Sequence, residues 1–150
     1  MGNQVKKHIE IAAPLSRVWR ALTDSRQFGE WFLVKMDGPF VAGQPVGGQI
    51  THPGYEHLRM EIVVKAIEPE TLFSYTWHPY AIDPKVDYSK EESTLVEFRL
   101  EATAFGTLLT VTETGFDKIP AARRAEAIRM NDGGWAQQVK NIQAYVAKTS

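Results

Sequence analysis

The sequence WAQQVKNIQAYV at residues 135–146 constrains how the rest of the chain can fold. Its apolar residues recur at spacings of 4, 3 and 4: Trp135, Val139, Ile142 and Val146. This spacing puts the four side chains on one face of an α-helix. The pattern extends upstream through Ile128 and predicts a helix from about 120 to 148. Such a face needs a second layer of structure to cover it.

Gly133-Gly134 interrupts this predicted helix. Two glycines inside a helix cost about 2 kcal/mol relative to alanine. A straight helix over the whole segment would be about 43 Å long, which exceeds the ~30 Å diameter of a domain of this size. We therefore expect a bend or a broken start at the glycines.

Upstream of the helix the pattern changes to strands. Residues 4–12 alternate as a half-buried strand, Pro14 stops it, and two short helices follow up to Phe32. From Leu33 to Gly115, alternating apolar residues and turn signals predict about six more strands. Strands in sequence followed by a helix predict an α+β fold with an antiparallel sheet of about six to seven strands, in one domain over residues 1–150.

Composition excludes several function classes. The chain has 150 residues with 43% hydrophobic residues, 17 Lys plus Arg, 18 Asp plus Glu, and no cysteine. The balanced charge argues against nucleic-acid binding, and the missing cysteines exclude disulfides, thiolate nucleophiles and cysteine-based metal sites. No apolar run approaches the ~20 residues of a membrane span, and no secretory signal is recognisable. We expect a cytoplasmic protein with no cofactor.

One set of large side chains has two interpretations. Its members are Trp31, Phe73, Tyr75, Trp77, Trp135 and Val139. They either form plain core, because aromatic residues dominate core burial, or line a wedge between sheet and helix that binds a ligand. We treat all six as candidate ligand-binding residues and leave both interpretations open.

Polar residues on expected inner faces provide weak catalytic candidates. Asp132 lies three residues before Trp135, on the predicted inward stripe, while Tyr75 and His78 stand at the end of an aromatic strand. An acid/base pair of Asp132 with either residue is one hypothesis. The alternative is that Asp132 is solvated or accepts backbone N–H bonds near the glycines.

The sequence gives no other chemical motif. Gly47-Gly48 has the wrong spacing for a phosphate-binding loop and predicts a sheet bend or bulge. His52, Glu56, His57 and His78 lack the helical spacing of a zinc site, so we expect no metal site.

Several short motifs, in this order, give a resemblance that covers nearly the whole chain. They are Ala13-Pro14, Val18 to Asp24, Trp31-Phe32, Gly47-Gly48, Tyr75-Thr76-Trp77, Gly115-Phe116 and Gly134-Trp135 with the 142–146 stretch. The chain resembles the START-like, Bet v 1-like superfamily (SRPBCC). Within it, the chain is most similar to the family of the C-terminal domain of the activator of Hsp90 ATPase. The resemblance implies a helix-grip fold, in which a curved antiparallel sheet wraps the C-terminal helix around a cavity.

The resemblance implies three alternative functions. The first is a domain that binds a small hydrophobic or amphipathic molecule. The residues themselves add one expectation, since the loop 79–93 is long, polar and interrupted by Pro79 and Pro84, which suits a mobile gate. The second is an Hsp90-type co-chaperone or ATPase-activator-like interaction protein. The third is a cavity enzyme of the cyclase, aromatase or hydrolase type. None implies nucleic-acid binding or membrane insertion.

Overall fold

The computed structural model describes residues 4–79 and 88–149. Its elements follow one another along the chain as β1 (Gln4–Ile11), α1 (Leu15–Thr23), α2 (Ser25–Phe32), β2 (Val34–Met36), β3 (Pro45–Ile50), β4 (Arg59–Glu68), β5 (Leu72–Trp77), η1 (Tyr88–Lys90), β6 (Thr94–Ala102), β7 (Thr107–Thr114), η2 (Phe116–Lys118) and α3 (Ala121–Thr149). This order confirms the predicted α+β class with two short helices after the first strand.

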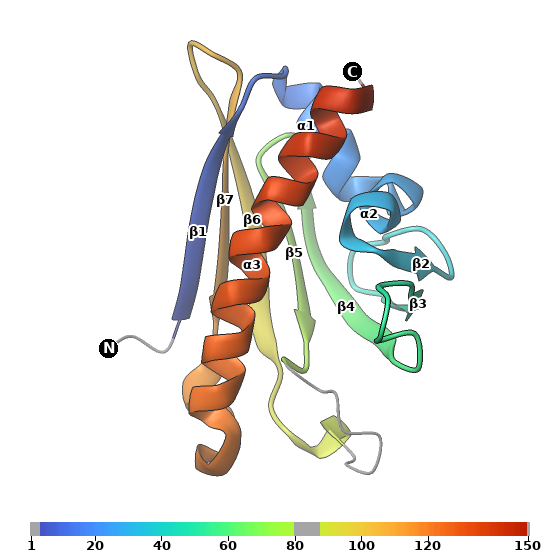
Figure 1. Ribbon diagram of the computed structural model, residues 1–150, viewed down its shortest axis with the longest axis vertical. Helices are drawn as coiled ribbons and strands as arrows, with labels where there is room; N and C mark the ends of the chain where they lie inside the picture. Colours follow the sequence, from blue (N-terminus) through green and yellow to red (C-terminus); the bar gives the residue numbers. More distant parts are fainter. Residues whose placement is uncertain (1–3, 80–87, 150) are drawn as a thin grey trace.

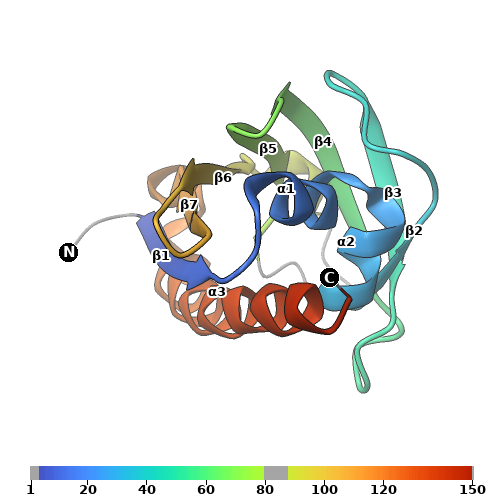
Figure 2. The same ribbon diagram turned by 90° about the horizontal axis from the view of Figure 1, so that it is seen from above.

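The seven strands form one antiparallel sheet in the order β1-β7-β6-β5-β4-β3-β2. Consecutive strands are neighbours throughout, except that β1 closes the sheet beside β7. Seen from above, the sheet forms an arch, and α3 runs across its open side from the β1 edge towards α2 (Figure 2). This is the helix-grip arrangement.

Helix α3 is continuous, so the predicted bend at Gly133-Gly134 is wrong. The helix runs along the long axis of the molecule (Figure 1), and its first residues, 121–126, are mostly exposed. The diameter expected for a domain of this size applies to a spherical shape, whereas an elongated domain accommodates the full helix. The predicted face is confirmed, since Trp135, Val139, Ile142 and Val146 are all buried.

Local interactions fix the start of α2 and the turn that leads from its end into β2. Asp24 caps α2 by accepting hydrogen bonds from the backbone N–H groups of Arg26 and Gln27, at 3.0 and 3.2 Å. Leu33 ends α2 in the left-handed conformation, with φ of 67°. A Cβ on Gly29 would lie 2.1 Å from the Val34 carbonyl oxygen, so the tight turn into β2 requires glycine there.

The glycine pair at 47–48 serves close packing. A Cβ on Gly48 would lie 2.8 Å from a Val34 methyl carbon and 2.9 Å from the Lys35 carbonyl oxygen. The sheet's register shift lies elsewhere, between Val64 and Ala66 of β4. The bulge predicted at Gly47-Gly48 is therefore wrong.

None of the helices in the described residues is long and apolar enough to cross a membrane.

Candidate functional site

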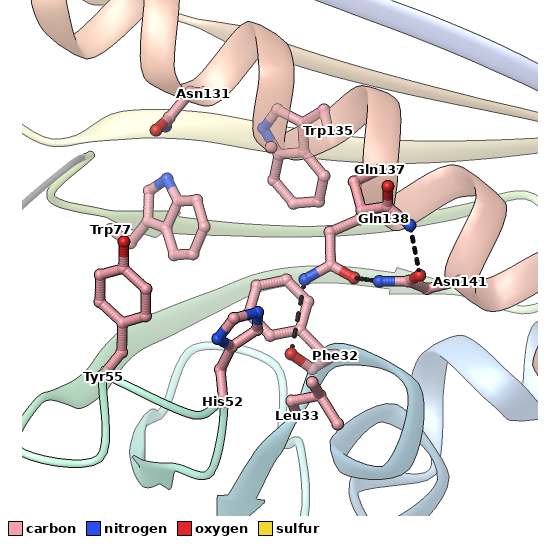
Figure 3. Close-up of a pocket in the computed structure, with 11 residues that line it drawn as sticks. Phe32, Leu33, His52, Tyr55, Trp77, Asn131, Trp135, Gln137, Gln138 and Asn141 are labelled. Atoms are coloured by element: carbon pink, nitrogen blue, oxygen red, sulfur yellow. Dashed lines mark hydrogen bonds between the residues drawn. The ribbon is translucent and has the colours of Figure 1, made fainter.

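A pocket of about 360 Å³ opens between α3, the end of β5 and the β3–β4 loop (Figure 3). Its lining residues are Phe32, Leu33, His52, Tyr55, Trp77, Asn131, Gly134, Trp135, Gln137, Gln138 and Asn141. His52, Tyr55 and Gln137 are exposed, so the pocket reaches the molecular surface. Roughly half of the lining is aromatic or aliphatic, and the rest is mainly side-chain amide.

Three rings form what we call the aromatic wall: Phe32, Trp77 and Trp135. The centroids of Trp77 and Trp135 lie 5.7 Å apart, and Phe32 lies 6.2 Å from Trp77 and 6.1 Å from Trp135. The rings come from the end of α2, the end of β5 and the middle of α3. This wall therefore depends on three elements that are distant in sequence.

The polar part of the pocket lining includes three side-chain amides of α3, which we call the amide row: Gln137, Gln138 and Asn141. Gln137 Nε2 donates to Asn141 Oδ1 at 2.9 Å, and Asn141 Nδ2 donates to Gln138 Oε1 at 2.8 Å. Gln138 Nε2 donates to the carbonyl oxygen of Phe32 at 3.4 Å. The row thus ties α3 to the last residue of α2 (Figure 3).

The β3–β4 loop supplies the outer side of the pocket. The Leu33 carbonyl accepts a hydrogen bond from the Thr51 N–H at 2.9 Å, which joins the loop to the end of α2. The rings of His52 and Tyr55 then contact each other edge-on, with centroids 5.5 Å apart. Gln49 Nε2 donates to the Leu58 carbonyl at 2.8 Å and closes the base of the loop.

A buried carboxylate lies behind the aromatic wall. Glu113 on β7 is 0% exposed. Its Oε1 accepts from Trp135 Nε1 at 2.8 Å and from Asn131 Nδ2 at 2.9 Å. Its Oε2 accepts from Trp77 Nε1 at 2.8 Å and from Thr94 Oγ1 at 2.5 Å. One side chain therefore orients both indoles and the asparagine that line the pocket.

Glu113 is not among the residues predicted from the sequence, although the sequence carries a signal for it. Leu109, Val111 and Glu113 share one parity on β7, and all three are buried. A carboxylate that continues an inward-facing apolar series is unusual, because buried charges need several partners. Extending the alternation by one step would have identified it.

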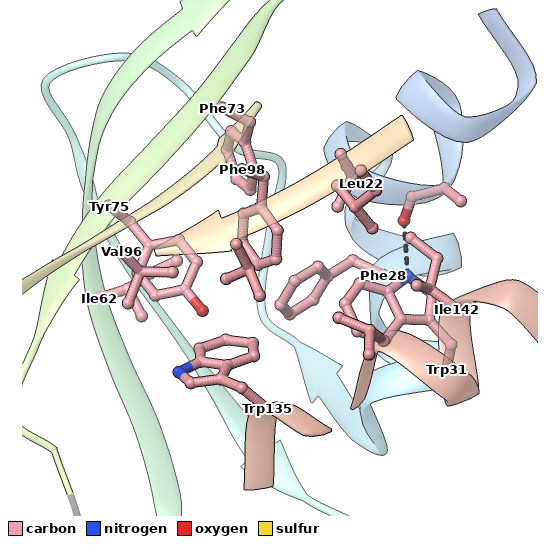
Figure 4. Packing of buried hydrophobic residues seen from close by; sticks show 14 of the residues in the cluster. Leu22, Phe28, Trp31, Ile62, Phe73, Tyr75, Val96, Phe98, Trp135 and Ile142 are labelled. Atoms are coloured by element: carbon pink, nitrogen blue, oxygen red, sulfur yellow. Dashed lines mark hydrogen bonds between the residues drawn. The ribbon is translucent and has the colours of Figure 1, made fainter. Parts of the chain in front are cut away.

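The six candidate ligand-binding residues divide into two groups. Trp77 and Trp135 line the pocket. The other four do not line it and are buried in the core: Trp31, Phe73, Tyr75 and Val139. Figure 4 shows Phe73, Tyr75 and Phe98 packed together above Trp135. Trp31 donates its Nε1–H to the Ala21 carbonyl at 2.8 Å, which satisfies it within the core.

The structure does not bring the three weak catalytic candidates together. Asp132 is exposed on the β1 side of α3, where it forms an ion pair with Lys7 at 3.1 Å. The prediction that Asp132 lies on the inward stripe is wrong, because it falls at the edge of that stripe. The His78 Nε2 lies 3.1 Å from the Glu91 carbonyl oxygen. Tyr75 is fully buried, and its hydroxyl has no hydrogen-bond partner among the described residues.

Two further predictions concern neighbouring loops. In the described part of the chain, no three His, Asp or Glu side chains gather as a potential metal site. The loop predicted as a gate, 79–93, includes residues 80–87, which lie outside the described residues. At its two ends, Arg123 of α3 donates to the Pro79 carbonyl at 2.8 Å and to Glu91 at 2.7 Å.

Comparison with known proteins identifies the family. The family described as activator of Hsp90 ATPase homolog 1-like protein matches residues 12–147. The chain belongs to this family. The resemblance inferred from the sequence is thereby confirmed over nearly the whole chain. No curated protein matches the chain significantly.

Solved structures share the fold of this family member. A Mesorhizobium loti protein is 28% identical, with 98% of each chain covered and a TM-score of 0.76. A solution structure of an Arthrobacter aurescens protein has a TM-score of 0.77 at 17% identity, covering 99% of this chain and 88% of that one. DynU16, a putative protein of the dynemicin biosynthetic locus, has a TM-score of 0.75 at 22% identity, covering 98% of this chain and 48% of that one.

Proposed function

We propose that this protein binds a small amphipathic molecule in the pocket between α3, β5 and the β3–β4 loop. The observation that carries the proposal is the lining itself, with an aromatic wall on one side and an amide row on the other. Its volume of about 360 Å³ falls within the roughly 300–1,000 Å³ of small-molecule sites, which combine apolar surface with a few oriented polar groups.

The hydrogen-bond direction along the amide row defines what a ligand meets. The Phe32 carbonyl can only accept, so Gln138 must present its Nε2 there and its Oε1 to Asn141. Asn141 in turn presents its Oδ1 to Gln137 Nε2. This leaves Gln137 Oε1 as an acceptor at the exposed end of the row. That oxygen can accept a hydrogen bond from a donor group of a ligand.

A pair of adjacent glycines allows a matched test. Gly134 lines the pocket and Gly133 does not, and a Cβ at either position meets nothing within 4 Å. Gly134→Leu should fill part of the pocket without disturbing the helix, while Gly133→Leu adds the same side chain outside it. The probe is octan-1-ol, followed through the indole N–H resonances of Trp77 and Trp135 in nitrogen-labelled protein.

We expect octanol to shift these two resonances saturably in the parent protein and in Gly133→Leu. Gly134→Leu should weaken the affinity about tenfold or more, since ~1.4 kcal/mol of lost contact is a factor of ten. The indole of Trp31, which is hydrogen-bonded in the core, should not respond. Equal affinity in both leucine variants, or no saturable shift, would contradict the proposal.

The family name raises a chaperone-linked role as the alternative. It predicts that the protein changes the ATPase rate of an Hsp90-type chaperone, and that Gly134→Leu leaves this effect intact. A rate change with an unresponsive pocket would favour this alternative over ligand binding.

A further inference from the structure

The charge around the pocket points to the chemical class of its ligand, an inference that rests on the proposed function. None of the described lining residues is Asp, Glu, Lys or Arg. Three of the lining residues instead share one charged partner, the Glu113 carboxylate. Trp77, Trp135 and Asn131 all line the pocket and all donate their polar hydrogens to it.

The donor set fits the ionised form of Glu113. Three of its four partners are N–H groups, which have no lone pair to offer a carboxyl proton. With Thr94, two donors meet each oxygen, and four donors match the acceptor sites of a carboxylate. The pKa of the Tyr75 phenol lies well above its ordinary value. Burial is the larger cause, and the negative charge of Glu113 is the smaller one.

This negative charge has no cationic partner in the part of the chain that the structure describes. The basic residues near α3 are paired elsewhere, Lys7 with Asp132 and Arg123 with Glu91. Its hydrogen bonds come from neutral groups alone, so they stabilise the charge without cancelling it. The field of Glu113 therefore extends through the wall into the pocket, where burial limits screening by salt.

Two features on the pocket side of the aromatic wall add further negative potential. Ring faces carry negative potential and attract cations, tryptophan most strongly. Hydrogen bonding of an indole N–H to a carboxylate polarises the ring further in this direction. Phe32 is also the last residue of α2, so the negative end of that helix dipole borders the pocket.

We propose that the pocket selects amphipathic ligands that carry a cationic ammonium group. The ammonium lies over the Trp77 and Trp135 rings, opposite the buried Glu113 carboxylate. An anionic head group meets repulsion from Glu113 and finds no lysine or arginine among the described lining residues.

The test compares three probes that share one alkyl chain: octylammonium, octan-1-ol and octanoate. Affinities are measured at neutral pH from the Trp77 and Trp135 indole resonances. Octylammonium should bind about tenfold tighter than octanol, and octanoate weakest, because the tryptophan rings and the Glu113 carboxylate both favour a cation. The net charge of the chain is only -1, so bulk attraction contributes little. Gly134→Leu should weaken all three probes.

Glu113→Gln keeps the size of the side chain and removes its charge. The ratio of octylammonium to octanol affinity should fall to about threefold or less, which leaves the ring contribution alone. Unchanged octanol affinity reports that the pocket is intact. A full ammonium preference in that variant overturns the role of Glu113.

The ranking in the parent protein decides the proposal even where Glu113→Gln fails to fold. Octanoate binding as tightly as octylammonium overturns the ammonium preference and leaves the proposed function standing, because octanol still binds. Absence of binding by all three probes overturns the proposed function and the preference together.

Discussion

At the scale of single residues, the Tyr75 hydroxyl is the least satisfied group in the described core. The side chain is fully buried, and its oxygen has no hydrogen-bond partner among the residues that the structure describes. Tyr75→Phe should therefore raise the free energy of unfolding by about 1 kcal/mol, since a buried polar group without a partner carries an uncompensated desolvation cost. Urea denaturation measures this.

Tyr145→Phe is the matched control. The Tyr145 hydroxyl donates to Glu30 Oε1 at 2.5 Å, so its removal should lower stability by about 0.5–1.5 kcal/mol. A loss of similar size in Tyr75→Phe would mean that its hydroxyl has a partner.

Tyr75 also gives stability a dependence on alkaline pH. Burial, with a smaller contribution from Glu113, raises the pKa of its phenol well above 10 in the folded protein. In the unfolded chain this group loses its proton near pH ~10, so the unfolded state then binds fewer protons and stability falls as pH rises. Tyr75→Phe should reduce this slope by up to ~1.4 kcal/mol per pH unit. Equal slopes above pH ~10 in the two proteins would contradict this assignment.

The role of a single residue could be predicted only where it follows from the periodicity of the sequence. Trp77 and Trp135 border the pocket, whereas Phe73 shares the parity of Trp77 and lies in the core. Parity distinguishes the inner from the outer face of a strand, but not which inner residues meet a void. Glu113 was accessible to the same rule, and its four donors from other elements were not.

At the scale of elements, the glycines of α3 should limit its stability. Gly133 has no positive φ, is exposed, and leaves open space for a Cβ. Gly133→Ala should therefore stabilise the protein by about 0.5–1 kcal/mol, because alanine restricts the unfolded chain and favours helix. Thermal unfolding of the variant tests this, and a lower midpoint than in the parent would show that the helix needs glycine there.

Helix α3 is also held at its start by Arg123. Its guanidinium contacts Glu91 and the Pro79 carbonyl, and stacks over the Tyr88 ring at 4.7 Å. Arg123→Gln should lower stability by about 1.5–3 kcal/mol, since charge-assisted bonds at a partly buried site are lost.

Arg129→Gln is the control on the same helix. Arg129 pairs with Glu126 at 2.8 Å on an exposed face, where such pairs contribute about 0–1 kcal/mol. Chemical denaturation of both variants compares the two arginines. Equal losses would contradict a special role for Arg123.

At the scale of the whole molecule, the order of elements could be predicted and their spatial separation could not. Alternation and helical spacing gave the α+β class, the two short helices and the buried face of α3. The pocket depends on how far α3 stands from β5 and the β3–β4 loop, which no local pattern encodes. The bend predicted at Gly133-Gly134 is wrong for the same reason, because that prediction depends on a spherical shape of the molecule.

The pairing of β1 with β7 has a consequence for the synthesis of the chain. The β1 strand ends at Ile11, and β7, its partner in the sheet, begins at Thr107. At roughly 5–20 residues per second, a ribosome needs about 5–20 s to make the intervening chain. Throughout that interval β1 remains an open edge, free to pair with another nascent chain. Lys6, Lys7 and Glu10 interrupt its apolar residues, and such charges discourage edge-to-edge association. The charged residues of β1 thus protect the protein before the sheet exists.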